Sequence, residues 1–380
     1  MNKLQKIVRA FSPGRYCANV CATGGRILQL LLFVVIAPIP LSAQDYTNAL
    51  DLTVVGKYCE TQHPWDRLDA REGMSDGEKG QARQSAGLAV AFSTNSKSIG
   101  VRVKWRKKAA DGWNNGAIAA RGFDLYIEKD GRWIWAGNGY HKNTPDEPHE
   151  VTLIPDCGNG EKNCIVYLPL SSVIETLEIV TTEGSWIEPA TQPFKGRIAV
   201  WGSSYTHGSG AGRCAMTWEA QLARATGYNF INLGFSGNCK LQPYFADALL
   251  DAPAVDAFVF DAFSNPSPKQ VQERLEPFIE KFVKARPGVP LIFIQTIRRE
   301  KRNFSTSYDS KEHAKRTTAD EMMRQMAAKY PDVYWITTTN ATSPTNEATS
   351  DGSHPDSYGY TLWMESVKAP ILEILNKYGI

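Results

Sequence analysis

The fold of this chain is decided by one stretch, Arg197-Ile-Ala-Val-Trp-Gly-Ser-Ser-Tyr-Thr206. Residues 197–201 form a short apolar run typical of a strand, and a glycine and two serines follow at once. Similar runs alternate with helical patterns along the rest of the chain, at residues 230–233, 257–260, 291–295 and 333–337. Alternating strands and helices form a parallel, doubly wound sheet. The sequence therefore predicts an α/β domain with a five-stranded sheet over residues 195–380.

The helix after the third strand has the clearest start signals. Ser267 can cap it, Pro268 suits its first position, and Gln270 completes a capping box. The apolar residues that follow share one helical face; they are Val271, Leu275, Phe278, Ile279, Phe282 and Val283. We therefore expect this stripe to be buried.

Residues 44–194 follow a different pattern, in which apolar and polar residues alternate. In residues 98–106 every second position from Ile99 to Trp105 is apolar, while the other set of alternate positions includes Arg102, Lys104 and Arg106. Similar runs lie at residues 87–92, 123–128, 132–136, 151–154, 164–168 and 177–181. Asp130-Gly131 suits a hairpin turn. The pattern predicts an all-β sandwich over residues 44–194, which precedes the α/β domain.

Residues 1–43 have the features of an export signal. Basic residues (Lys3, Lys6, Arg9, Arg15 and Arg26) precede an apolar run at 27–39, and Leu41-Ser42-Ala43 offers small residues for cleavage. The run is too short to span a bilayer comfortably, and Pro38 and Pro40 would end a helix. We expect a signal peptide over residues 1–43 and a periplasmic or secreted mature protein without a stable membrane span.

Composition restricts the partners and cofactors. Five of the 42 basic residues and none of the 40 acidic residues lie in the leader, so the mature chain is close to neutral. This balance argues against nucleic acid as a partner. None of the cysteines after the leader has the paired CxxC spacing of a zinc or redox site. No metal or organic cofactor is expected.

Export favours disulfides. Cys157 and Cys164 enclose only a short loop, residues 158–163, which predicts a bridge between them. Cys214 and Cys239 are a second predicted pair, because they lie on loops that leave the same edge of the predicted sheet. These pairings would leave Cys59 free.

Side chains that could perform nucleophilic catalysis lie at two places. Ser203 and Ser204 follow the first α/β strand, at the edge of the sheet where open α/β sheets bind ligands. A serine nucleophile needs a base, an acid that orients the base, and donors for the oxyanion. Asp351-Gly-Ser-His354 offers the acid and the base in a turn beyond the fifth strand. The same spacing occurs at Asp146-Glu-Pro-His149, so spacing alone does not identify the base.

These candidate residues, taken in their order along the chain, resemble the sequence blocks of the SGNH/GDSL hydrolases. Gly202-Ser203-Ser204 stands where the family has Gly-Asp-Ser, which carries the nucleophile onto Ser204. Asp351-x-x-His354 is similar to the family block that supplies acid and base. Ser203 departs from the pattern, since it replaces the family's acidic residue.

Two further blocks imply the oxyanion donors. Asn232-Leu-Gly-Phe-Ser-Gly237 resembles the glycine block, which makes the Gly237 N–H a donor beside the Ser204 N–H. Asn265 stands where the family's Gly-x-Asn-Asp asparagine donates its amide, although Phe263 and Pro266 replace the glycine and aspartate. Each residue taken singly also suits an ordinary turn. The order of all four blocks at strand ends favours catalysis.

A second resemblance lies in the β region. Gly122-Phe-Asp-Leu-Tyr126 is similar to the GxDLY motif of the β-domain that precedes certain bacterial SGNH esterases. Together the two resemblances imply a flavodoxin-like SGNH hydrolase domain behind a GxDLY β-domain. Tryptophans of the β region, such as Trp105 and Trp113, could stack on sugars, but alternating tryptophans are usually sandwich core or strand surface.

The resemblance implies an exported serine esterase in which Ser204 attacks an ester, His354 takes its proton and Asp351 orients His354. The expected substrate is a short acyl ester, most simply acetyl, of a carbohydrate, as the family and export suggest. Two alternatives stay open. One is a lipid ester or thioester hydrolase, and the other is a carbohydrate-binding protein that has lost activity, which Ser203 and Pro266 would permit.

Overall fold

The computed structural model describes residues 43–142, 147–338 and 342–380. Apart from Ala43, the predicted signal peptide lies outside the described residues, as does Asp146. The described residues belong to one compact unit. None of the helices in the described ranges is long and apolar enough to cross a bilayer.

The C-terminal part is built on a five-stranded sheet in the order β12-β11-β13-β14-β15, with every neighbouring pair parallel. The chain thus visits the sheet in the 2-1-3-4-5 order of doubly wound, flavodoxin-like folds, which confirms the predicted α/β fold. Each strand coincides with a predicted apolar run. The strands are β11 (Lys195–Gly202), β12 (Tyr228–Gly234), β13 (Ala257–Asp261), β14 (Leu291–Ile294) and β15 (Val333–Ile336).

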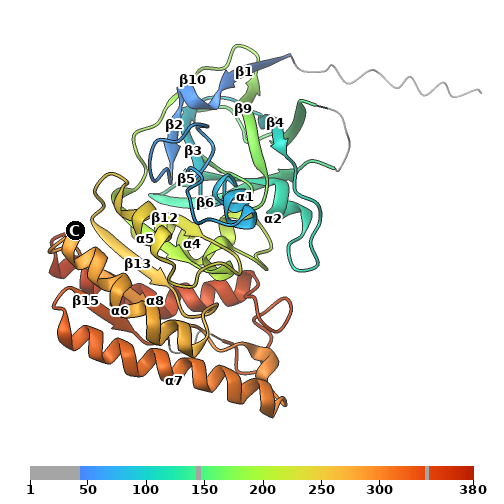
Figure 1. Cartoon of the computed structure of the whole chain (residues 1–380). Coiled ribbons are helices and arrows are strands. Elements are labelled where there is room, and N and C mark those ends of the chain that lie inside the picture. Colours follow the sequence, from blue (N-terminus) through green and yellow to red (C-terminus); the bar gives the residue numbers. More distant parts are fainter. Residues whose placement is uncertain (1–42, 143–146, 339–341) are drawn as a thin grey trace, which may run out of the picture. The chain divides into compact units, whose positions relative to one another are not determined.

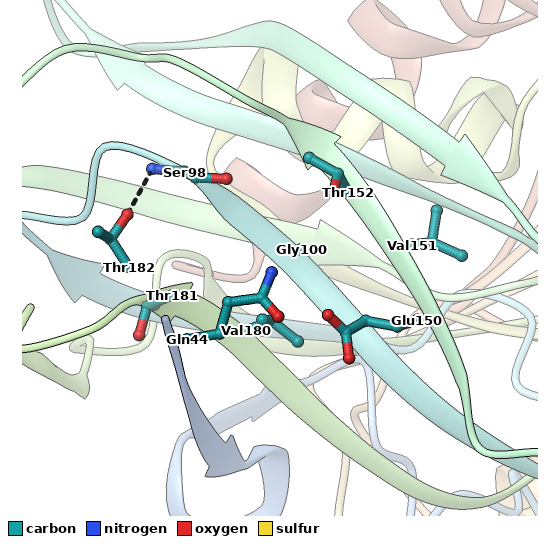
Figure 2. A pocket seen from close by; sticks show the side chains of 9 residues that line it. All are labelled: Gln44, Ser98, Gly100, Glu150, Val151, Thr152, Val180, Thr181 and Thr182. Carbon is teal, nitrogen blue, oxygen red and sulfur yellow. Dashed lines mark hydrogen bonds between the residues drawn. The ribbon is translucent and has the colours of Figure 1, made fainter. Parts of the chain in front are cut away.

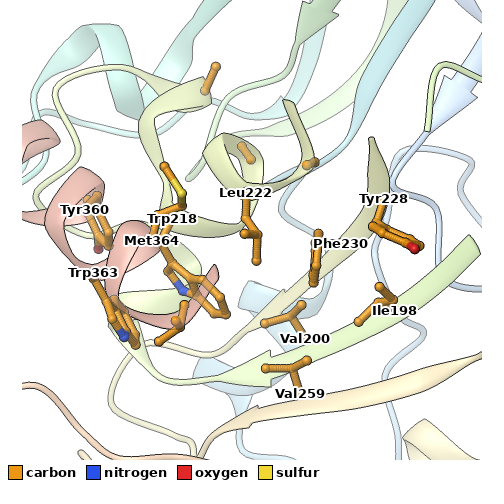
Figure 3. Packing of buried hydrophobic residues seen from close by; sticks show 14 of the residues in the cluster. Ile198, Val200, Trp218, Leu222, Tyr228, Phe230, Val259, Tyr360, Trp363 and Met364 are labelled. Atoms are coloured by element: carbon orange, nitrogen blue, oxygen red, sulfur yellow. The ribbon is translucent and has the colours of Figure 1, made fainter. Parts of the chain in front are cut away.

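Helices cover both faces of this sheet. Successive residues of β11 point to opposite sides, so Val200 joins one core cluster and Trp201 joins another. The Val200 cluster contains Trp218 of α4 and Trp363 of α8, whose rings are 4.9 Å apart (Figure 3). The other cluster contains residues of α5, α6 and α7, and α6 and α7 lie side by side (Figure 1). The helices are α3 (Ser204–His207), α4 (Trp218–Thr226), α5 (Pro243–Leu250), α6 (Pro268–Ala285), α7 (Thr306–Lys329) and α8 (Ser357–Lys377).

The predicted start of α6 is confirmed. Ser267 accepts a hydrogen bond from the backbone N–H of Gln270, and the Gln270 side chain accepts one from the Ser267 N–H. Most of the predicted apolar stripe is buried in the core, namely Val271, Leu275, Phe278, Ile279 and Phe282.

The β region consists of two antiparallel sheets whose inner faces share one apolar core. Every predicted strand is present, and Trp105 lies in the core as the structural interpretation of the tryptophans expects. The first sheet has the order β1-β9-β4-β7, with β1 (Gln44–Asn48), β9 (Val173–Thr182), β4 (Ile99–Lys107) and β7 (His149–Ile154). The second contains β10 (Ile187–Pro189), β3 (Ala89–Thr94), β8 (Lys162–Tyr167), β5 (Gly122–Lys129) and β6 (Arg132–Tyr140), and β2 (Thr53–Val55) pairs with β3. Two short helices, α1 (Asp76–Ala82) and α2 (Ala117–Arg121), complete the region, and the 3-10 turns of the chain are η1 (Ala49–Asp51), η2 (Cys214–Met216) and η3 (Glu300–Arg302).

The predicted disulfides are wrong, because all five cysteines of the described residues are free. Cys164 lies in the core of the sandwich, and the Cys157 thiol instead donates to the carbonyl oxygen of Lys97 at 3.1 Å. Cys214 and Cys239 lie in the clusters on opposite faces of the parallel sheet, so they cannot meet. Burial raises the pKa of the Cys164 thiol to about 12, which keeps it protonated.

The β region and the parallel sheet meet around one buried arginine. Arg67, which is 1% exposed, lies in the loop between β2 and α1. Its guanidinium donates to the carbonyl oxygens of Gln81 and Gln84 in its own region, at 2.8 and 3.0 Å. It also donates to the Gly234 carbonyl and the Asn232 side chain at the end of β12, at 3.0 and 3.1 Å. Burial lowers the pKa of Arg67 to about 9, so the group remains charged at neutral pH.

Replacing Arg67 by alanine should lower the free energy of unfolding by about 3–5 kcal/mol, because several buried acceptors lose their donor at once. The matched control is Arg71→Ala. Arg71 lies in the same loop but forms an ion pair with Asp251 at the surface, where such pairs are worth about 0–1 kcal/mol. Urea denaturation of both variants measures the difference, and an equal loss in the two would show that the Arg67 network does not join the regions.

Candidate active site

Ser204 lies in the tight turn that joins β11 to α3. Ser203 caps α3 by accepting a hydrogen bond from the Tyr205 N–H at 3.2 Å, and Ser204 is the first helical residue. The turn requires a glycine before it, since a Cβ on Gly202 would lie 2.2 Å from Thr206 Oγ1. Ser204 is 8% exposed, so its hydroxyl reaches the surface only narrowly.

A buried carboxylate on the neighbouring strand holds this turn. Asp261 ends β13, directly beside Gly202 in the sheet register. Its Oδ2 accepts hydrogen bonds from the Ser203 N–H at 3.1 Å, the Ser203 hydroxyl at 2.8 Å and the Thr206 hydroxyl at 3.2 Å. Burial raises the pKa of Asp261 to about 6. The Ser203 hydroxyl is therefore committed to Asp261, and only Ser204 is available to a base.

The structure brings Ser204, His354 and Asp351 together in one hydrogen-bonded chain. His354 Nε2 lies 3.0 Å from Ser204 Oγ, and His354 Nδ1 lies 2.6 Å from Asp351 Oδ2. Both histidine and aspartate come from the loop before α8, where Asp351 Oδ1 accepts the backbone N–H groups of Ser353 and His354 at 2.7 Å.

The charge of Asp351 determines the histidine tautomer. Burial acts to raise the pKa of Asp351, but hydrogen bonds from the His354 backbone and ring and from the Ser353 backbone outweigh it, and the pKa is lowered. An ionised carboxylate can only accept, so His354 Nδ1 carries the proton. His354 Nε2 is then free to accept the hydroxyl proton of Ser204.

The three predicted oxyanion donors follow three adjacent strands. Ser204 follows β11, Gly237 follows β12 and Asn265 follows β13, so all three lie at the carboxyl edge of the sheet. Gly237 occupies the third position of a turn closed by the Asn238 N–H and the Phe235 carbonyl, and its φ of +73° suits glycine. Within the described residues, the N–H groups of Ser204 and Gly237 donate to no protein acceptor.

A hydrogen bond to its amide oxygen orients the side chain of Asn265. Asn265 Oδ1 accepts the Cys239 N–H at 3.2 Å, which leaves the amide nitrogen for another acceptor. Phe263, which replaces the family glycine, is buried against Trp335 with ring centroids 5.3 Å apart. Its side chain thus fills the core behind the loop.

A buried polar network supports the glycine block. The amide of Asn232 donates to the Thr206 carbonyl at 2.6 Å and to the carboxyl group of Glu219 on α4. Burial raises the pKa of Glu219 to about 7. Neither Glu219 nor Asp261 is marked by a sequence motif, although Asp261 could have been found from its place at the end of a strand beside Ser204.

The other histidines perform different tasks. His207 is buried, its Nε2 lies 2.9 Å from the Leu170 carbonyl oxygen, and its Nδ1 lies 3.2 Å from the Ser236 hydroxyl. Burial lowers the pKa of His207 to about 3, so it is a neutral link between the two regions. His149 lies in β7, where its Nδ1 accepts the indole N–H of Trp105 at 2.9 Å. In the described ranges, no three His, Cys, Asp or Glu residues form a group that could hold a metal ion.

One hollow elsewhere on the described chain lacks this chemistry. With a volume of about 40 Å³, it lies over the sheet of β1, β9, β4 and β7 and contains hydroxyl and carboxylate groups but no histidine (Figure 2). Its Ser98 N–H donates to the Thr182 hydroxyl, and no base lies beside its serine.

Comparison with known proteins agrees with the geometry. The model of the GDSL-like lipase/acylhydrolase family matches residues 195–372, and the model of the N-terminus of SGNH-hydrolase-type esterases matches residues 44–187. A crystal structure from Bacteroides ovatus ATCC 8483, described as that of a GDSL-like lipase, is 34% identical with a TM-score of 0.83. The alignment covers 88% of this chain and 98% of that one. The chain belongs to the GDSL-like lipase/acylhydrolase family.

More distant structures share the fold of this GDSL hydrolase. The salicylyl-acyltransferase SsfX3 from a tetracycline biosynthetic pathway is 18% identical with a TM-score of 0.67, over 87% of this chain and 97% of its own. The acetyl xylan esterase Est2A from Butyrivibrio proteoclasticus is 11% identical with a TM-score of 0.54, over 89% of this chain and 99% of its own. A search of curated proteins found no match.

Replacing each of the two adjacent serines by alanine tests which one this hydrolase uses as a nucleophile. Ser204→Ala should lower kcat for p-nitrophenyl acetate by at least about 10³-fold, because it removes the predicted nucleophile. Ser203→Ala should keep activity within about tenfold and lose about 1–2 kcal/mol of stability, because Asp261 loses one donor. If Ser203→Ala were the inactive variant, the assignment of the nucleophile would be wrong.

Glu219 should make stability depend on pH. Burial on folding raises the pKa of Glu219 from 4.5 to about 7. Between pH 4.5 and pH 7 the folded chain therefore holds a proton that the unfolded chain has released. Ionising Glu219 therefore destabilises the fold as pH rises toward 8. Glu219→Gln mimics the protonated form and should gain about 2–3 kcal/mol relative to wild type between pH 5 and pH 8. Urea unfolding of both proteins at pH 5 and at pH 8 measures this gain. A difference in unfolding free energy that is the same at the two pH values would contradict the prediction.

Proposed function

We propose that this GDSL hydrolase is an exported serine esterase that removes short acyl groups, acetyl above all, from carbohydrates. The observation that carries the proposal is the chain of hydrogen bonds from Ser204 through His354 to Asp351. Such a chain at the carboxyl edge of a doubly wound sheet is the arrangement that serine acyl transfer requires. Export is proposed from the sequence of residues 1–43 alone.

The first half of the reaction transfers the acyl group to the enzyme. Ser204 Oγ attacks the ester carbonyl carbon while its proton moves to His354 Nε2, and Asp351 stabilises the imidazolium. The carbonyl oxygen becomes an oxyanion, which the N–H groups of Ser204 and Gly237 and the Asn265 amide would hold. The intermediate collapses, the bond to the alcohol breaks, and the alcohol leaves with the proton from His354.

The second half releases the acid. Water attacks the acyl-serine carbonyl, and its proton passes to His354 Nε2. The bond to Ser204 Oγ then breaks, the carboxylic acid leaves, and Ser204 regains its proton. This cycle uses no group beyond the side chains and backbone of the chain.

The loops around Ser204 favour a short acyl group. Residues 207–213, 238–240 and 264–267 are mostly small or polar, and they offer little apolar surface for an acyl tail. The backbone of Gly210 in the first of these loops packs against His354, since a Cβ on Gly210 would lie 3.1 Å from the Cβ of His354.

An exposed ring supports a carbohydrate as the leaving group. Trp113 is 82% exposed, and it adjoins Asn114, whose amide is hydrogen-bonded to Asp351. His354 must return its proton to the leaving alcohol, so an aromatic face near this loop could stack on a sugar ring. The intact hydrogen-bonded chain favours an enzyme over a carbohydrate-binding protein without activity.

Acyl chain length separates this proposal from the lipid-ester alternative. A lipase gains about 0.8 kcal/mol for each methylene that it buries, so its kcat/KM should rise with chain length. We expect the reverse, with p-nitrophenyl acetate turned over at higher kcat/KM than the octanoate. Ser204→Ala measures the background for each ester. A clear preference for octanoate would overturn the carbohydrate-acetyl proposal in favour of a lipid substrate.

A further inference from the structure

The β region reaches into the catalytic site through a single amide. Asn114 lies in the loop between β4 and α2, and its Nδ2 donates to Asp351 Oδ2 at 3.1 Å. The same nitrogen lies 3.2 Å from His354 Nδ1. No other side chain of the β region, within the described residues, forms a hydrogen bond with Asp351 or His354.

The geometry points to Asn114 as a positioning residue that the β region supplies to the catalytic acid and base, an inference that rests on the proposed esterase function. His354 Nδ1 carries the proton that it donates to Asp351, so it has no lone pair for a second donor. The short approach of Asn114 to Nδ1 therefore results from two donors that converge on one oxygen, Asp351 Oδ2.

With Asn114 in place, the carboxylate of Asp351 is saturated. Its Oδ1 accepts the backbone N–H groups of Ser353 and His354, and its Oδ2 accepts the His354 ring and the Asn114 amide. Two oxygens offer about four acceptor positions, and all four are used. Asp351 thus cannot rotate without breaking hydrogen bonds, and the plane of the His354 ring follows from its orientation.

The loop that carries Asn114 is itself fixed to the β region. Asp111 forms an ion pair with Arg121 of α2 at 2.5 Å, and Arg121 also donates to the Ala109 carbonyl at 3.2 Å. On the other side, the amide of Asn115 donates to the Ser171 hydroxyl at 2.8 Å. The position of Asn114 is therefore set before any substrate binds.

Other ionisable groups surround the pair without replacing Asn114. The Tyr205 ring meets the His354 ring edge-on at 5.7 Å, and Arg299 donates to the Tyr205 hydroxyl. Lys301 packs against Gly352, and Glu300 accepts backbone and hydroxyl donors of residues 348 and 349. Burial and nearby acidic groups, Asp351 among them, raise the pKa of Tyr360, whose hydroxyl donates to the Ser209 carbonyl.

The test compares Asn114→Ala and Asn114→Asp with Ala110→Ser, a neutral change at an exposed position of the same loop. Asn114→Ala should lower kcat for p-nitrophenyl acetate about tenfold and leave KM within twofold, because it disturbs the orientation of His354 and not binding. Asn114→Asp places a second negative charge beside the imidazolium and should move the acid limb of kcat/KM to higher pH by at least about half a unit. Ala110→Ser should change kcat by less than about twofold and leave the acid limb in place.

Two results would overturn the inference. One is an equal loss in Asn114→Ala and Ala110→Ser, and the other is an acid limb that Asn114→Asp leaves unmoved. Nitrogen NMR of the His354 ring tests the inference even if the protein does not hydrolyse the ester, an outcome that would contradict the proposed function separately. The midpoint of the His354 titration should move upward in Asn114→Asp and stay in place in Ala110→Ser, and a constant midpoint would contradict the positioning role. Circular dichroism of each variant confirms that it is folded.

Discussion

The buried guanidinium of Arg67 is the constraint on which the arrangement of this molecule depends. A charged group out of water is tolerated only when its donors are satisfied, and the acceptors of Arg67 are divided between the β region and the end of β12. Separating the two regions would remove the acceptors of Arg67 at the end of β12 and leave the cation with only the carbonyls of Gln81 and Gln84. The β-domain is thus held against the sheet edge that carries the glycine block, and the loop of Asn114 is brought to the same edge.

The same edge shows that a structural need can be met by different residues. The turn at Ser204 needs an acceptor for several converging donors, because Ser203 and Thr206 point their polar groups inward. Where the family has an acidic residue at the position of Ser203, this chain has a hydroxyl. The acceptor here is Asp261, one strand away, and the departure at position 203 leaves the hydrogen bond from Ser204 to His354 in place.

The sequence predicted the strands of the parallel sheet because uninterrupted apolar runs flank helical patterns, and it predicted Ser204, His354 and Asp351 because their blocks occur in a familiar order. It did not reveal β1, nor β2 and β10, which have three residues each and lie beside longer strands. No disulfide joins Cys157 to Cys164 although both contact the same apolar core, and the Cys157 thiol donates to the Lys97 carbonyl instead. Closeness along the chain therefore does not by itself predict a bridge.

Arg67 and Asn114 could not be recognised from local sequence because each acts on residues far away along the chain, whereas Asp261 is marked only by its place at the end of a strand. Hydrogen bonding is divided unevenly across the site. The acid Asp351 is saturated with donors, whereas the N–H groups of Ser204 and Gly237 have no acceptor within the described residues. In the proposed reaction, the acid that must not move is fixed from every side, and the N–H groups that would meet the developing charge are left open. Donors held in this way would need no reorganisation when the oxyanion forms, and electrostatic stabilisation of that kind is usually the largest contribution that such a site makes to rate.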